Sequence, residues 1–248
     1  MTSKTYDEIG TGYAQTRRAD VRHEHAILDA LGGARTVVNV GAGTGSYEPR
    51  ELLVVAVEPS ATMIMQRPPA SAAVVQASAE ALPFGDGAFE GGLAVLTVHH
   101  WRDTSAGLRE LRRVVTGPVV VFTADIDVWS QMWLVRDYLP EIGELDRRRF
   151  PSPERIAEDL GGARIEPLLT PADCTDGFTP AFWRRPWAYL DPAVRRAQSS
   201  FATLGEETVG PGLAALEDDL RSGAWHERNC RLLELENFDA GHRLVIAG

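Results

Sequence analysis

The sequence predicts an α/β protein built on an open, mostly parallel sheet. Apolar runs rich in β-branched residues alternate with helical patterns along the chain. The first run, Thr36 to Val40, leads into the glycine-rich segment Gly41-Ala42-Gly43-Thr44-Gly45. The second run, Leu52 to Val57, ends on an acid, Glu58. A buried strand that feeds a glycine turn, beside a strand that ends in a carboxylate, is typical of nucleotide-binding sheets.

Composition favours one large globular unit and argues against several classes of protein. The 248 residues carry a formal net charge of −10 and show no Lys/Arg stripe, so we expect no nucleic-acid partner. No apolar run approaches the roughly 20 residues of a spanning helix, and the N-terminus lacks a signal-peptide core. We therefore expect no membrane partner and a cytoplasmic location. Cys174 and Cys230 have neither metal-ligand spacing nor disulfide density, and the oligomeric state leaves no trace in the sequence.

The glycine turn and Glu58 together predict a nucleotide-type cofactor. Glycines at alternate positions let the backbone turn sharply and approach a ligand, and a helix after them would aim free N–H groups at the same place. Glu58 can accept two hydrogen bonds from a ribose diol. A nicotinamide fingerprint has the spacing Gly-x-Gly-x-x-Gly, whereas here Ser46 follows a Gly-x-Gly-x-Gly pattern and the acid comes early.

The remaining elements follow from hydrophobic periodicity and turn signals. The pentapeptide Leu-Gly-Gly-Ala-Arg occurs at 31–35 and at 160–164, and each copy marks a helix, a Gly-Gly cap and then a strand. The other expected strands are Ala73 to Gln76, Gly92 to Val98, Pro118 to Thr123, Ile165 to Leu169 and Gly241 to Ala247. The expected helices are Arg22 to Leu31, a short one after Pro59, Asp103 to Val115, Pro153 to Asp159, and two within Ala193 to Leu204 and Leu213 to Ser222.

Two adjacent histidines, His99 and His100, follow the fourth expected strand at its carboxyl end, where ligands of open α/β sheets bind. No Asp, Glu or Cys nearby completes a metal-ligand set, so a metal site is disfavoured. Two interpretations stay open. Either one ring packs and the other caps the next helix, or one imidazole with a pKa near neutrality accepts a proton from a substrate. The residues alone do not choose between the two histidines.

These motifs resemble those of class I S-adenosylmethionine (AdoMet) methyltransferases of the type 11 kind. Val38 to Gly45 is similar to the first motif, Val57 to Ser60 to the second, and Ala77 to Phe84 to the third. The resemblance implies a Rossmann-like fold with a seven-stranded, mostly parallel sheet, an antiparallel last strand between the fifth and sixth, and a helical cap. It also implies S-adenosyl-L-methionine as the cofactor and S-adenosyl-L-homocysteine as its product.

The same resemblance assigns residues to the cofactor. Tyr6-Asp7, Tyr13 and Arg17 match a pattern that folds over AdoMet, with the Arg reaching the methionine carboxylate, whereas periodicity alone predicts a surface helix. Met63 would pack on the adenine, although a methionine in such a place is usually core filler. The implied cofactor-binding residues are Tyr13, Arg17, Gly41, Ala42, Gly43, Glu58, Pro59, Met63, Ser78, Ala79, Glu80 and Thr97.

We expect residues 1–169 to form the AdoMet-binding core with an N-terminal lid helix, with 124–152 partly in a cap. Residues 170–235 would be a helical insertion over the strand ends, and 236–248 a final strand that returns to the sheet. The aromatic residues of the insertion either wall an apolar or aromatic acceptor site or form its own small core. The predicted function is methyl transfer to a small molecule. Two alternatives are AdoMet binding without methyl transfer and, less favoured, an NAD(P)-dependent oxidoreductase.

Overall fold

The computed structural model describes residues 18–196 and 198–248. In this part of the chain, seven strands form one sheet in the order β3-β2-β1-β4-β5-β9-β6, in which β9 alone is antiparallel. The strands are β1 (Thr36–Val40), β2 (Leu53–Val57), β3 (Ala73–Val75), β4 (Gly91–Val95), β5 (Val119–Ala124), β6 (Arg164–Pro167) and β9 (His242–Ala247). The predicted Rossmann-like sheet, with its last strand antiparallel between the fifth and sixth, is confirmed.

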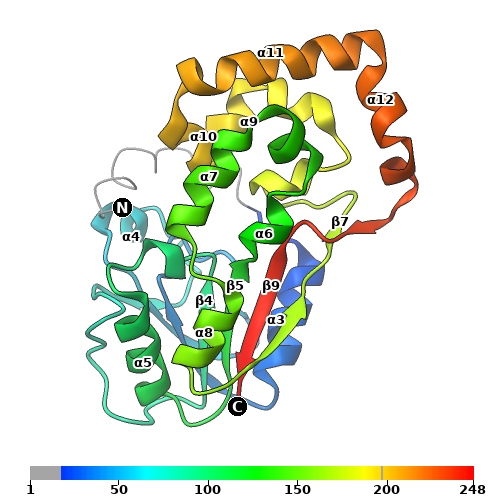
Figure 1. Cartoon of the computed structure of the whole chain (residues 1–248). Helices are drawn as coiled ribbons and strands as arrows, with labels where there is room; N and C mark the ends of the chain where they lie inside the picture. Colours follow the sequence, from blue (N-terminus) through cyan, green and yellow to red (C-terminus); the bar gives the residue numbers. More distant parts are fainter. Residues whose placement is uncertain (1–17, 197) are drawn as a thin grey trace.

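The two faces of the sheet bury different sets of strand residues. Val38 and Val121 pack with Leu111 and Ile156, which α5 and α8 contribute. Their neighbours along the strands point to the opposite face and pack against α3, because successive side chains of a strand alternate. Figure 1 shows α3 on one side of the sheet and α5 and α8 on the other. These helices are α3 (Val21–Leu31), α5 (Thr104–Val114) and α8 (Pro153–Asp159).

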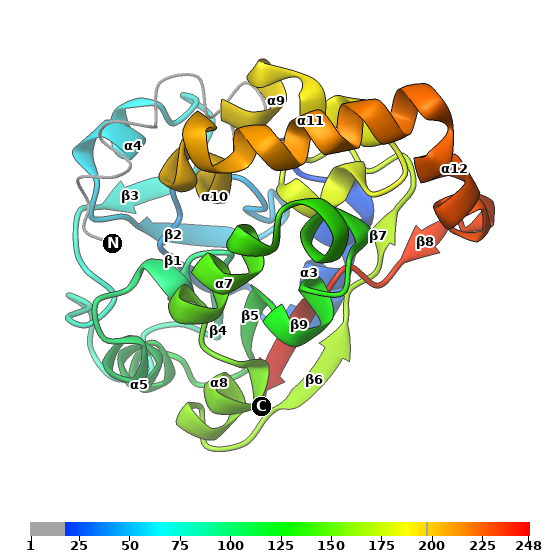
Figure 2. The ribbon, with the colours of Figure 1, turned by 45° about the horizontal axis from the view of Figure 1, so that its top comes forward.

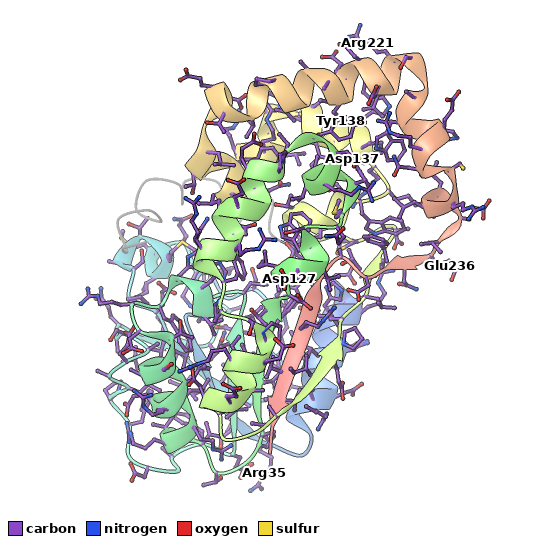
Figure 3. All side chains as sticks on the ribbon, in the orientation of Figure 1. Arg35, Asp127, Asp137, Tyr138, Arg221 and Glu236 are labelled. Carbon is purple, nitrogen blue, oxygen red and sulfur yellow. The ribbon has the colours of Figure 1, made fainter. Side chains whose placement is uncertain are left out.

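Most of the remaining helices lie over the carboxyl edge of the parallel strands (Figure 2). Arg35, which precedes β1, and Arg221, in α11, mark opposite ends of the molecule in Figure 3. We call this upper region the cap. Its elements are α6 (Ile126–Trp129), η2 (Leu134–Tyr138), α7 (Pro140–Arg149), η3 (Thr179–Phe182), η4 (Pro186–Leu190), α9 (Pro192–Arg196), α10 (Ser199–Leu204), α11 (Glu206–Ser222), α12 (Ala224–Asn229) and η5 (Cys230–Glu234), with the paired strands β7 (Thr170–Pro171) and β8 (Asn237–Phe238) beside them.

The cap has a core of its own, centred on Trp133. The ring of Trp133 makes edge-on contacts with Tyr138, Tyr189 and Trp225 at centroid distances of 5.1–6.0 Å. One buried cluster contains side chains from 124–142 and from 183–225. Gly212 lets α11 approach closely, because a Cβ at that position would lie 2.1 Å from the carbonyl oxygen of Tyr138. Residues 124–142 therefore share one core with the later helices.

Three local expectations are wrong. In the described chain no helix follows the glycine turn, and the residues from Ser46 to Leu52 form turns and bends instead. The fourth strand ends at Val95 rather than Val98, since Leu96 adopts a left-handed φ of 48°. His99 and His100 consequently lie in a short 3-10 turn, η1 (Val98–His100). The expected helix from Ala193 to Leu204 is divided into α9 and α10.

Two features of the described residues bear on function. None of the described helices is long and apolar enough to cross a membrane. Nor do three or more His, Cys, Asp or Glu side chains gather anywhere in that part of the chain as a metal site would require.

Candidate functional site

The glycine turn lies across the end of β2 and against Thr97. The backbone N–H groups of Gly41 and Ala42 both donate to the carbonyl oxygen of Val57, at 2.8 and 3.0 Å. Gly41 has a φ of 72°, and a Cβ there would lie 2.1 Å from Oγ1 of Thr97. This position therefore requires glycine, both for its dihedral angle and for the space beside it. The structure brings Gly41, Ala42, Thr97 and the end of β2 together.

Glu58 is buried at the tip of β2 and holds the turn. Its Oε2 accepts a hydrogen bond from the backbone N–H of Gly43 at 2.8 Å, and its Oε1 accepts one from Ser60 at 2.9 Å. Burial raises the pKa of this carboxyl group, while the two N–H donors and the charge of Arg67 oppose that change. Each oxygen accepts one hydrogen bond from the described residues and has a second lone pair, so the carboxylate can still accept a ribose diol. The residues present therefore fit AdoMet.

Met63 and Pro59 complete the neighbourhood of the turn. Met63 is buried, and its Cε lies 3.4 Å from where a Cβ on Gly43 would be. It therefore packs on the glycine turn, as both core filler and a cofactor contact would. The carbonyl oxygen of Pro59 accepts a hydrogen bond from Nε2 of Gln76, which ties the start of the short helix α4 (Ala61–Met65) to the end of β3.

The third motif lies beside the start of α5. Ala79 is buried and close to Gly107 of α5, whereas Ser78 is exposed. Glu80 accepts hydrogen bonds from the backbone N–H groups of Arg102 and Asp103 at 2.8 and 3.2 Å. Its carboxylate therefore fastens this loop to the helix, and the roles of these residues toward a cofactor stay predictions. Tyr6, Asp7, Tyr13 and Arg17 lie outside the described residues.

A buried ion pair between Arg67 and Glu48, which was not predicted from the sequence, supports the glycine turn. Nη2 of Arg67 lies 2.6 Å from Oε1 of Glu48, and the two side chains are 4% and 8% exposed. Arg67 also donates to the carbonyl oxygens of Gly43 and Ala72, and Glu48 accepts from Nδ2 of Asn39. The pair therefore joins β1, the glycine turn and the start of β3. Glu48 lies in the segment after Gly45 where a helix was expected. No local pattern signals it, because the two residues lie on separate loops.

A cavity opens between the carboxyl edge of the sheet and the cap. Counted together with the open solvent at its mouth, the empty space amounts to about 670 Å³. It begins where β4 and β5 end and β9 starts. The lining residues are Leu96, His99, His100, Ala124, Ile126, Trp129, Asp146, Phe150, Phe178, Thr179, Pro180, Gln198, Ser199, Ser200, Ala240 and His242.

The two candidate bases differ in their surroundings. The His99 ring stacks on Phe150 with centroids 3.7 Å apart, and the His100 ring lies 3.8 Å from that of His99. Burial, reinforced by the positive charge of Arg149, lowers the pKa of His100 to about 3. A group that holds a proton so weakly is a poor base near neutral pH. Of the two histidines, His99 is therefore the better candidate.

Several polar residues that line the cavity were not predicted from the sequence, among them Asp146, Ser200 and Gln198. Asp146 is buried, and its carboxylate accepts from Nε1 of Trp129 at 3.1 Å and from Oγ of Ser200 at 2.8 Å. Gln198 also lines the cavity. A signal for Asp146 did exist, because it shares the buried face of its helix with Ile142, four residues earlier. Ser200 and Gln198 stand in no such pattern.

Known proteins resemble this chain over its motifs and, in one case, over nearly its whole length. A family model described as a methyltransferase domain matches residues 38–119. A solved structure assigned as a methyltransferase from an antibiotic biosynthesis pathway of Anabaena variabilis ATCC 29413 is 32% identical, with 94% of this chain and 99% of that one aligned and a TM-score of 0.87.

Two further relatives are more distant or shorter in overlap. A SAM-dependent methyltransferase from Thermotoga maritima, a candidate histamine N-methyltransferase, shares the fold at 23% identity, with 68% and 83% coverage and a TM-score of 0.52. The uncharacterized protein YafE of Escherichia coli K12 is 41% identical over 64 residues. That match spans 25% of this chain and 29% of the length of YafE. Because the Anabaena relative is 32% identical along nearly the whole of both chains and shares the fold, this chain belongs to the class I AdoMet-dependent methyltransferases.

Proposed function

We propose that this protein transfers the methyl group of AdoMet to a small molecule bound in the cavity beneath the cap. One observation carries this proposal. Thr97 lies against Gly41 of the glycine turn, while its neighbours Leu96, His99 and His100 line the cavity. The same short segment therefore borders both the predicted cofactor site and the candidate acceptor site.

The chain mainly has to hold two reactants in line. When bound, AdoMet supplies a methyl group that its sulfonium already activates. Gly41, Gly43 and Glu58 would bind the cofactor, and the cavity walls would orient the acceptor toward it. Alignment of this kind can contribute up to about 7–11 kcal/mol to catalysis. A base such as His99 would add a factor of roughly 10²–10⁴ if the acceptor has to lose a proton.

The cavity favours an acceptor with an apolar or aromatic body. Rings of Trp129, Phe150 and Phe178 form much of its wall, and Leu96 and Ile126 add aliphatic surface. Such walls bind flat, apolar ligands, which a few polar groups then orient. The assignment of the Anabaena relative to an antibiotic biosynthesis pathway agrees with a small-molecule acceptor.

Two measurements test the proposal. Calorimetric titration should show that AdoMet and S-adenosyl-L-homocysteine bind, and radiolabelled AdoMet should transfer its methyl group to one or more members of a panel of aromatic acceptors. Thr179→Phe, which fills the cavity, should abolish transfer and leave AdoMet affinity unchanged. Thr208→Phe on the exposed side of α11 is the matched control and should preserve both.

The competing functions give different results. Binding of AdoMet with no labelled product from any acceptor would favour a methyltransferase-like protein without methyl transfer. Binding of reduced nicotinamide cofactor in an absorbance titration, with no response to AdoMet, would favour an oxidoreductase.

A further inference from the structure

One polar side chain of the cavity differs from the others. Gln198 lines the cavity and is 2% exposed. Both its side-chain nitrogen and its side-chain oxygen are buried, and neither has a hydrogen-bond partner in the part of the chain that the structure describes. An amide in this state has two donors and an acceptor available to whatever occupies the cavity.

The neighbours of Gln198 form hydrogen bonds with its backbone but not with its side chain. Its backbone N–H donates to the carbonyl oxygen of Arg195 at 3.0 Å, and its carbonyl accepts from Ala202 at 3.1 Å. The side chain makes no capping bond to α10. By contrast, Asp146 uses both carboxylate oxygens on Trp129 and Ser200. The fold therefore fixes the position of Gln198 but provides no hydrogen-bond partner for its side-chain amide among the described residues.

A buried amide without partners costs free energy, so such groups usually meet a water or a ligand. A carboxamide carries its C=O and N–H groups in one plane. Its full complement is a second planar group with an N–H and a C=O, which pairs with it through two hydrogen bonds. A site of this kind discriminates strongly against ligands that lack the polar group, because the buried amide is then left unpaired.

Two charged residues, Asp146 and Arg149, lie in or near the cavity. Burial raises the pKa of Asp146, and the positive charge of Arg149 opposes that change, so these two groups of opposite sign lie near each other. No ion pair joins them among the described residues, and the three guanidinium nitrogens of Arg149 are buried there without a hydrogen-bond partner. An anion site near Arg149 is therefore the alternative that the probes must separate from a site at Gln198.

We propose that Gln198 determines specificity by binding a planar group that contains both a carbonyl oxygen and an N–H, such as a carboxamide or a lactam. The aromatic walls formed by Trp129, Phe150 and Phe178 hold the rest of the molecule. This inference rests on the proposed function in one respect, since that function makes the bound molecule the methyl acceptor.

Three probes of similar shape test the inference: benzamide, benzoate and cumene. Their dissociation constants can be measured by ligand-observed NMR with the full chain, with and without AdoMet. We expect benzamide to bind about tenfold more tightly than cumene and more tightly than benzoate. Gln198→Met keeps the length of the side chain and should erase the preference for benzamide while cumene binds as before. Gln131→Met, at an exposed glutamine, is the matched control and should retain the wild-type preference.

Equal affinities for benzamide and cumene in the wild-type protein would overturn the inference, because water would then satisfy the amide as well as a ligand does. Tighter binding of benzoate would overturn it in favour of an anion site near Arg149. Neither result depends on a variant that folds. A benzamide preference in a protein that fails to bind AdoMet would sustain the inference and refute the proposed function, so the two failures are distinguishable.

Discussion

The edge of the sheet around the glycine turn and the cap above it are built in different ways. Around the turn, Glu58 bonds the backbone of Gly43 and Ser60, which are 15 and two residues away in sequence. In the cap, Asp146 bonds Ser200 across 54 residues, and Trp133 bonds the carbonyl oxygen of Trp183 across 50. The first region is thus assembled largely from neighbouring chain segments and backbone groups, and the second from distant side chains.

This difference agrees with the proposed roles of the two regions, in which the turn binds the cofactor and the cap binds the acceptor. A cofactor that many proteins share can be held by backbone groups, since their geometry depends little on side-chain identity. A particular acceptor needs side chains placed by a specific core, and the packing around Trp133 supplies that core. We therefore expect substitutions at the turn to act on AdoMet and substitutions in the cap to act on the acceptor or on local stability.

The largest effect should come from Arg67→Met, because it leaves the buried carboxylate of Glu48 without its cation. Breaking one side of a buried ion pair costs about 3–5 kcal/mol of unfolding free energy. AdoMet affinity should fall as well, since Arg67 also bonds the carbonyl oxygen of Gly43. Denaturant unfolding and calorimetry measure the two quantities.

Two variants serve as controls for the ion pair. Arg35→Met breaks the pair with Glu90, whose side chains are 84% and 38% exposed, and should leave the free energy of unfolding nearly unchanged, because solvent screens such a pair. The double variant Glu48→Leu/Arg67→Met removes both charges and should recover much of the lost stability. A mild effect of Arg67→Met alone would mean that the ion pair does not support the turn.

The next effect concerns Glu58. Glu58→Ala removes the carboxylate that would accept the ribose diol and should weaken AdoMet binding by about 10- to 100-fold. Glu51→Ala, at an exposed acid that precedes β2, should leave the affinity unchanged. Titration calorimetry on both variants decides the matter, and unchanged affinity in Glu58→Ala would remove the main support for the cofactor site.

The sequence was informative where neighbouring segments define the structure. The strand that ends at Val40, its glycine turn and the acid at the end of β2 could all be predicted, because each depends on a few adjacent residues. The helix expected after Gly45 was wrong: residues 46–52 form turns, and Glu48 of this segment pairs with the distant Arg67, a contact that no local pattern reveals. The end of β4 was also wrong, since a left-handed Leu96 leaves no mark in an apolar run.

The packing of the cap could not be predicted in the same detail as the glycine turn. Its helices were expected in outline, yet the cavity depends on which faces of those helices meet. Gln198 and Asp146 lie 52 residues apart in sequence and line one cavity only after the cap has folded. Periodicity shows which face of a helix is buried, as at Ile142, but not which partner covers it.

A smaller effect, on the border between the two regions, should follow from His100. Its folded pKa is about 3 and its ordinary value is 6.5, so between these values the unfolded chain binds a proton that the folded protein does not. The free energy of unfolding therefore rises with pH in this window. The contribution of His100 is fully present above about pH 6.5 and is lost as the pH falls toward 3. His100→Gln should lose about 1–2 kcal/mol less than the wild type between pH 6.5 and 5. Parallel pH profiles in denaturant unfolding would contradict the burial of this ring.

The smallest effect should come from Tyr138→Phe in the cap. The hydroxyl of Tyr138 donates to Oδ2 of Asp219 at 2.7 Å and accepts from Arg228, so it ties η2 to α11 and α12. Figure 3 shows Tyr138 in the cap, far from Arg35 at the amino ends of the strands. Loss of the hydroxyl should cost about 0.5–1.5 kcal/mol, seen as faster hydrogen exchange in α11, while AdoMet affinity stays unchanged. A fall in AdoMet affinity would show that the cap and the turn are coupled, and the separation drawn between the two regions would then be wrong.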